Sequence, residues 1–65
     1  KYVLVLEIFG RKVDYYPVAS YNSGVLFQSE KGTRIFLTKW ELSHLEEVSF
    51  GDDVKISLLD FSWLQ

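Results

Sequence analysis

Short runs in which apolar and polar residues alternate constrain the fold of this chain more than any other feature of its sequence. A period of two, in stretches rich in β-branched and aromatic residues, is typical of strands that bury one face. The chain is therefore predicted to be all-β. The predicted strands are Tyr2–Phe9, Val13–Ala19, Val25–Ser29, Thr33–Lys39 and one that begins at Val54.

One segment, residues 40–48, departs from this alternation. Its apolar residues are spaced as on one face of a helix, and they are Leu42, Leu45 and Val48. We expect one or two helical turns here, ended by the turn residues Gly51-Asp52-Asp53 that lead into the late strand. Residues 61–64 would form a last short strand or the first part of one.

The first chain reversal is expected near Gly10-Arg11. A two-residue turn there would set Glu7 opposite Asp14, and two like charges facing each other across a strand pair are unfavourable. We therefore expect a bulge or a long bent strand near Gly10 rather than a tight hairpin. Pro17 cannot donate a ladder hydrogen bond, which predicts that the second strand lies at a sheet edge.

The next two reversals are marked by turn residues. Ser20–Gly24 reads as a loop, and Glu30–Gly32 joins two strands. If that turn has two or four loop residues, the pairing places Phe27 on the same face as Arg34 and Phe36. The opposite face would carry Leu26, Ile35 and Leu37.

Size and composition limit the class of protein. Sixty-five residues suit one domain, because compact domains need about 50 to 200 residues, and the start at Lys1 suggests a fragment of a larger protein. Five Phe, four Tyr and two Trp provide a core without any cysteine. The net charge of −2 excludes a strongly basic nucleic-acid-binding module. The longest apolar run, Tyr2–Leu6, is far shorter than the roughly 20 residues of a membrane span, so we expect a cytoplasmic protein with no membrane partner.

Strands followed by a short helix and a late strand are typical of a small five-stranded β-barrel. In an OB-fold the helix lies between the third and fourth strands, whereas in an SH3-like barrel a helical turn separates the last two. The helix length favours the OB-fold. Five strands ending near Leu59 favour the SH3-like alternative.

Two segments carry a family resemblance. Phe36–Ser43, an apolar strand ending at an "ELS" helical turn, and Phe50–Asp60, a "GDDV" turn opening a strand that closes on an aspartate, resemble the second half of S1 and S1-like RNA-binding domains. The similarity covers roughly Gly24–Asp60 and is greatest to the S1-like modules of CvfB-type virulence regulators. It implies an OB-fold that binds RNA without catalysis.

The resemblance has clear departures. Leu26 stands where the family usually has a solvent-facing aromatic residue, and Thr38 stands where it has a histidine in the third strand, or a proline in the CvfB-type modules. The usual RNA-stacking residues are therefore missing at those positions. The first part, Lys1–Ser23, is longer than one S1 strand requires.

The predicted binding site combines aromatic rings with cations on one sheet face. Bases of single-stranded nucleic acid stack on rings, and a guanidinium or ammonium group meets phosphate. The site residues are Phe27, Arg34, Phe36, Lys39 and Trp40. The expected partner is single-stranded RNA or DNA. The alternatives are a protein partner or flanking domain that contacts the same rings, and ordinary packing if another element covers this face.

No other pattern in the sequence points to chemistry. His44, the one histidine, has no suitably spaced metal-ligating partner. Asp52 and Asp53 are adjacent and are explained by turn hydrogen bonding. No nucleophile, acid-base pair or phosphate loop is recognisable. The prediction is a module without enzymatic activity, cofactor or metal.

Overall fold

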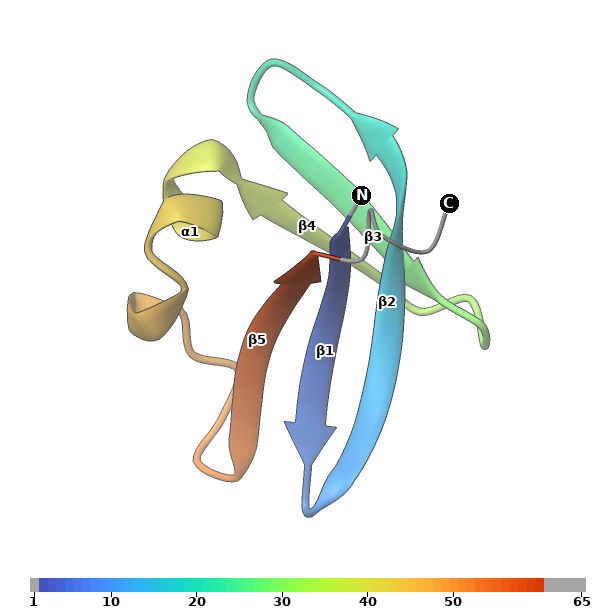
Figure 1. Ribbon diagram of the computed structural model, residues 1–65, viewed down its shortest axis with the longest axis vertical. Coiled ribbons are helices and arrows are strands. Elements are labelled where there is room, and N and C mark those ends of the chain that lie inside the picture. Colours follow the sequence, from blue (N-terminus) through green and yellow to red (C-terminus); the bar gives the residue numbers. More distant parts are fainter. Residues whose placement is uncertain (1, 61–65) are drawn as a thin grey trace.

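The computed structural model of the protein describes residues 2–60 (Figure 1). The short strand predicted over residues 61–64 lies outside them. The elements in chain order are β1 (Tyr2–Ile8), β2 (Arg11–Ser20), β3 (Gly24–Ser29), β4 (Arg34–Thr38), α1 (Lys39–Ser43), the 3-10 helix η1 (Leu45–Glu47) and β5 (Val54–Asp60). The predicted strands and the helical segment are therefore present, with ends that differ by a few residues.

The five strands form one antiparallel sheet in the order β4-β3-β2-β1-β5. The sheet curls into a half-barrel, and α1 and η1 connect its two outer strands (Figure 1). This confirms a small all-β barrel-like fold with one short helix before the late strand. The helical segment lies between the last two described strands, which is the placement that distinguishes the SH3-like alternative from the OB-fold.

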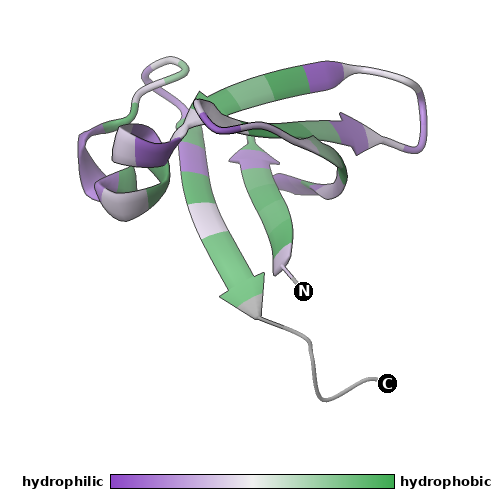
Figure 2. Cartoon of the chain, turned by 90° about the horizontal axis from the view of Figure 1, so that it is seen from above, coloured by the Kyte–Doolittle hydropathy of each residue, from purple (hydrophilic) through white to green (hydrophobic). Residues whose placement is uncertain are grey.

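The core occupies the concave side of the curled sheet. Its buried residues are Leu4, Leu6, Tyr15, Phe27 and Leu37. Leu42, Leu45 and Val48 of the helical segment pack against this cluster, as their helical spacing predicted. Hydrophobic residues are frequent along the strands, whereas the helical segment contains many hydrophilic residues (Figure 2). Burial of the concave face is the main stabilising contribution, because the chain has no disulfide.

The β1–β2 turn is a tight hairpin, not the bulge or long bent strand predicted near Gly10. Ile8 pairs with Arg11, so the turn has two residues, Phe9 and Gly10, with φ of 50° and 79°. Two successive positive φ values are typical of a type I′ hairpin, whose twist matches that of the strands. Placing the turn one residue earlier sets Glu7 opposite Lys12. The expected bulge was wrong because the like-charge pair that motivated it does not occur in this register.

Strand β2 lies inside the sheet, between β1 and β3, so the prediction of an edge strand was also wrong. Two local features accommodate Pro17 within it. The pairing of β1 with β2 ends at Leu4 and Tyr15, so that Pro17 is paired with β3 alone. The register with β3 also shifts between Pro17 and Ala19. A proline is tolerated where a bulge interrupts the ladder.

The β3–β4 turn has three residues, Glu30 to Gly32. The Ser29 N–H donates to the Thr33 carbonyl (2.9 Å), and Gly32, at φ 92°, donates to the Ser29 carbonyl (3.0 Å). A three-residue loop that ends in a residue with positive φ is a common hairpin type. Because the number of loop residues is odd, Phe27 pairs with Ile35 rather than lying beside Arg34 and Phe36.

The start of α1 has a signal that is visible in the sequence. Thr38 caps the helix: its hydroxyl accepts from the Glu41 N–H (3.2 Å), and the Glu41 carboxylate accepts from the Thr38 N–H (2.8 Å). This reciprocal arrangement is a capping box. It ends β4 and begins the helix at one defined residue, and so fixes where Lys39 and Trp40 leave the sheet.

Candidate nucleic-acid interface

The candidate interface lies on the convex face of β2, β3 and β4, opposite the core. Tyr16 pairs with Gln28, and Gln28 pairs with Arg34, so these three side chains form one row across the strands. The Arg34 Nε donates to the Gln28 Oε1 at 3.0 Å. Gln28 thereby orients the guanidinium along the sheet surface and leaves its other N–H groups able to donate.

Phe36 lies in the next row, beside its cross-strand partner Leu26. The Tyr21 ring, from the β2–β3 turn, lies 6.2 Å from the Phe36 ring between centroids, at an interplanar angle of 56°. Both rings are exposed, Phe36 at 42%. Tilted pairs at this distance are favourable. The two rings therefore support each other while keeping surface available for a ligand.

Trp40 and His44 form a second aromatic pair, on α1. Their ring centroids are 4.4 Å apart and the planes are 13° from parallel. The His44 Nδ1 lies 2.9 Å from the Trp40 carbonyl oxygen, which fixes the imidazole against the indole. The Trp40 ring remains more than half exposed. Lys39 is also exposed, and its backbone N–H donates to the Ser23 carbonyl at 3.1 Å.

The structure separates one predicted site residue from the others. Phe27 is only 2% exposed and belongs to the core. It cannot stack on a ligand base, so its assignment to the binding face was wrong. The cause is the three-residue β3–β4 turn, which places Phe27 on the opposite sheet face from Arg34 and Phe36. Arg34 and Phe36 do share one face, and Lys39 and Trp40 follow at the end of β4.

Sequence reasoning missed several residues of this face. Leu26 was expected on the face opposite Phe36, but it pairs with Phe36 on the convex face. Tyr21 was treated only as a loop residue, and Gln28 and Tyr16 received no role. Once the register is known, alternation alone assigns Tyr16, Leu26 and Gln28 to the Phe36 face. No sequence signal identifies the approach of Tyr21 to Phe36, because it depends on the path of the turn.

Residues 2–60 contain no group of three or more His, Cys, Asp or Glu side chains that is arranged to hold a metal ion. The candidate interface therefore depends on rings and single cations. Neither helical segment of the described chain has the length and hydrophobicity needed to cross a membrane.

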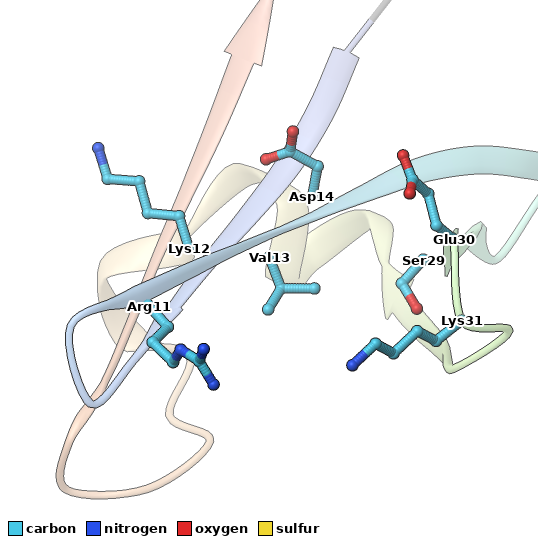
Figure 3. Close-up of a pocket in the computed structure, with 7 residues that line it drawn as sticks. All are labelled: Arg11, Lys12, Val13, Asp14, Ser29, Glu30 and Lys31. Carbon is cyan, nitrogen blue, oxygen red and sulfur yellow. The ribbon is translucent and has the colours of Figure 1, made fainter.

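A pocket of about 460 Å³ lies between the start of β2 and the β3–β4 turn, lined by residues from both faces of the sheet (Figure 3). Arg11, Val13, Ser29 and Lys31 point to one side of the β2 ribbon, whereas Lys12, Asp14 and Glu30 point to the other (Figure 3). Sequence reasoning did not anticipate this pocket, because its residues come from two segments that the β2–β3 register, with Tyr15 paired to Ser29, brings together.

The fold and the exposed rings define a class, a small all-β half-barrel with an aromatic outer face. Comparisons with protein-family models, with curated proteins and with solved structures give no match for the chain. A functional proposal therefore depends on the geometry of the described residues and on the S1-like sequence resemblance.

Proposed function

We propose that the protein is a non-enzymatic module that binds single-stranded nucleic acid, RNA in particular, as its sequence resemblance to S1-like domains suggests, on a sheet whose helical segment has the SH3-like placement. The observation that carries the proposal is the convex face on which the exposed Tyr21 and Phe36 pair lies one row from Arg34. Stacking of a base on an aromatic ring contributes about 1–3 kcal/mol. A guanidinium one row away is suited to the adjacent phosphate.

Two further features support the proposal. Trp40 presents a second exposed ring, and the exposed Lys39 adds a cation beside it. A strand that contacts both Phe36 and Trp40 would follow β4 into α1. With so few cations the affinity should be weak and only mildly salt-dependent, because each phosphate contact adds to the salt dependence.

The test is a titration of the isotope-labelled protein with a mixed-sequence single-stranded RNA at low salt, followed by NMR. Amides of residues 26–28 and 34–40 should shift and the tryptophan fluorescence should change. Replacing Phe36 with alanine should weaken binding by about 5- to 150-fold, which corresponds to one stacked base. Unchanged spectra at saturating RNA would contradict the proposal.

A matched control is available for each substitution. Phe50 is exposed to the same extent as Phe36, 42%, but lies in the loop before β5, so Phe50→Ala should leave RNA affinity unchanged. Arg34→Gln should weaken binding by a few fold, whereas Lys55→Gln, on the exposed face of β5, should have little effect. Equal losses in Arg34→Gln and Lys55→Gln would indicate nonspecific charge attraction, and equal losses in Phe36→Ala and Phe50→Ala would contradict stacking on Phe36.

A protein-interaction module is the second candidate, and the alternative partner is a protein or a flanking domain. It is favoured by the exposed apolar side chains Tyr16, Val18, Tyr21 and Phe36, together with a net charge of −2 that does not attract nucleic acid. Concentration-dependent self-association that is lost in Phe36→Ala, with no response to RNA, would favour this candidate.

A further inference from the structure

The pocket beside the β3–β4 turn combines cations from two separate elements. Arg11 begins β2 and Lys31 lies at the centre of the turn. Their charged groups point toward one another across Val13 (Figure 3). Two like charges that face each other create a positive potential between them, which favours an anion there.

Because side chains alternate between the two faces of β2, its carboxylate does not lie on the same face as Arg11. Arg11 shares the concave face with Val13 and Tyr15, whereas Lys12 and Asp14 point to the convex face. Asp14 and Glu30 point to the opposite side of the β2 ribbon from Arg11 and Lys31 (Figure 3). The acidic residues that line the pocket therefore lie on the other side of the ribbon from the two cations.

A hydroxyl completes the set of donors. Ser29 is 7% exposed, and its Oγ accepts from the Thr33 N–H at 3.2 Å. The same hydroxyl can still donate its own proton. None of the side-chain hydrogen bonds formed among residues 2–60 involves Arg11 or Lys31. Guanidinium, ammonium and hydroxyl groups are thus available together at one pocket.

The size of the pocket and the course of β2 are compatible with a small ligand. Pairing of β2 with β3 ends at Tyr15 and Ser29, so residues 11–14 continue along the pocket without a strand on that side. The volume of about 460 Å³ falls within the range of about 300–1,000 Å³ that is usual for small-molecule sites.

We infer that this pocket binds a phosphate group, either inorganic phosphate or the terminal phosphate of a small ester, between Arg11 and Lys31 with the Ser29 hydroxyl as third donor. A tetrahedral dianion matches these donors because it accepts a forked guanidinium contact and two further hydrogen bonds on separate oxygens. The site is distinct from the proposed RNA-binding face, since Arg11 and Arg34 lie on opposite faces of the sheet. Either proposal can fail without the other.

The experiment is an NMR titration of the intact chain with inorganic phosphate, with adenosine 5′-monophosphate, and with adenosine as the control that lacks phosphate. Amides of residues 11–14 and 29–32 should shift with a dissociation constant of about 1 mM, a weak affinity that suits an open site. Response to both phosphate compounds supports a site for a phosphate ester, and response to inorganic phosphate alone supports a site for the free ion.

Substitutions distinguish this site from general attraction of anions. Arg11→Gln and Lys31→Gln should each weaken phosphate binding about tenfold, since each removes a charged hydrogen bond. Lys12→Gln is the matched control, because it removes the same charge from a residue that lines the pocket but points to the other face. All three residues are exposed, so the variants should fold, as dispersed amide spectra would verify.

Two results would overturn the inference. One is the absence of shifts at residues 11–14 and 29–32 at about 10 mM phosphate, well above the expected dissociation constant. The other is an equal loss of affinity in Lys12→Gln and Lys31→Gln. Loss of phosphate binding in Lys31→Gln, with RNA binding retained, would separate this pocket from the RNA-binding face.

Discussion

The β1–β2 and β3–β4 hairpins of the sheet reverse the chain with different numbers of residues. Phe9 and Gly10 turn β1 into β2, and both have positive φ. Glu30 to Gly32 turn β3 into β4, and among these three only Gly32 has positive φ. The first turn places a bulky side chain in a backbone region that favours glycine, whereas the second places glycine where that region is needed.

The difference teaches that loop length decides which side chains form the core. Side chains alternate between faces with a period of two, so one loop residue more or less moves a whole strand's set to the other face. In the β3–β4 hairpin, the odd count places Phe27 with Ile35 and Leu37 inside. It leaves Arg34 and Phe36 outside, where they can contact a ligand.

The largest predicted effect is the loss of the Phe27 ring. Phe27→Ala should lower the free energy of unfolding by about 3–5 kcal/mol, because truncating a buried phenylalanine removes burial and leaves a cavity. Urea denaturation followed by circular dichroism measures the change. In a domain this small the variant can be largely unfolded without ligand.

Phe36→Ala is the comparison for Phe27→Ala, since both remove a phenylalanine ring but the two rings lie on opposite faces of the sheet. Phe36 is 42% exposed, so its truncation should change stability by no more than about 1 kcal/mol. If Phe36→Ala were the more destabilising of the two, the three-residue turn and the assignment of faces would both be wrong.

Gly32→Ala should have the next largest effect. An added Cβ meets no atom within 4 Å, but φ is +92°, and a left-handed conformation costs an ordinary residue roughly 1–2 kcal/mol. Thermal and urea unfolding should therefore show a loss of this size. Lys31→Ala, one residue earlier and exposed, should leave stability nearly unchanged, and equal losses would mean that side-chain contacts rather than φ explain the effect.

Reversing the charge of Glu7 tests the register of the first hairpin. Glu7 pairs with Lys12 on one side and Lys55 on the other. Glu7→Lys would place three like charges in one row and should destabilise the protein by about 1 kcal/mol, as facing like charges do in antiparallel pairs. The loss should shrink as salt screens the charges. If Glu7→Lys instead stabilised the protein, as pairing with Asp14 would predict, the two-residue turn would be incorrect.

The parts of the fold that depend on local pattern could be predicted from the sequence, and the parts that depend on turn geometry could not. Alternation located the strands, and the spacing of Leu42, Leu45 and Val48 located the helical segment. The register could not be predicted, because Glu30-Lys31-Gly32 is compatible with several loop lengths and because phenylalanine seldom adopts the φ of Phe9.

The residues of the candidate site divide in the same way: local pattern could place some of them, and turn geometry decided the others. Arg34 and Phe36 could be placed together because they are two residues apart on one strand. Phe27 and Leu26 were exchanged between faces because their position relative to Arg34 depends on the turn. The pocket of Arg11 and Lys31 could not be predicted, since it depends on the register that pairs Tyr15 with Ser29 and so brings the start of β2 beside the β3–β4 turn.

The smallest predicted effect is a gain in stability at the first turn. Phe9 has φ of 50° and is 78% exposed, so its ring contributes little burial while its backbone is strained. Phe9→Asn would create the Asn-Gly pair that type I′ turns favour, and the free energy of unfolding should rise by no more than about 1 kcal/mol, because asparagine tolerates this backbone region better than phenylalanine. Urea denaturation of wild type and variant measures this gain.

Phe50→Asn is the control for the Phe9 substitution, because it makes the same chemical change at an exposed phenylalanine without positive φ and should bring no comparable gain. A loss of stability in Phe9→Asn would mean that the ring makes contacts worth more than the strain. The two hairpins would then differ in what stabilises their turns as well as in length.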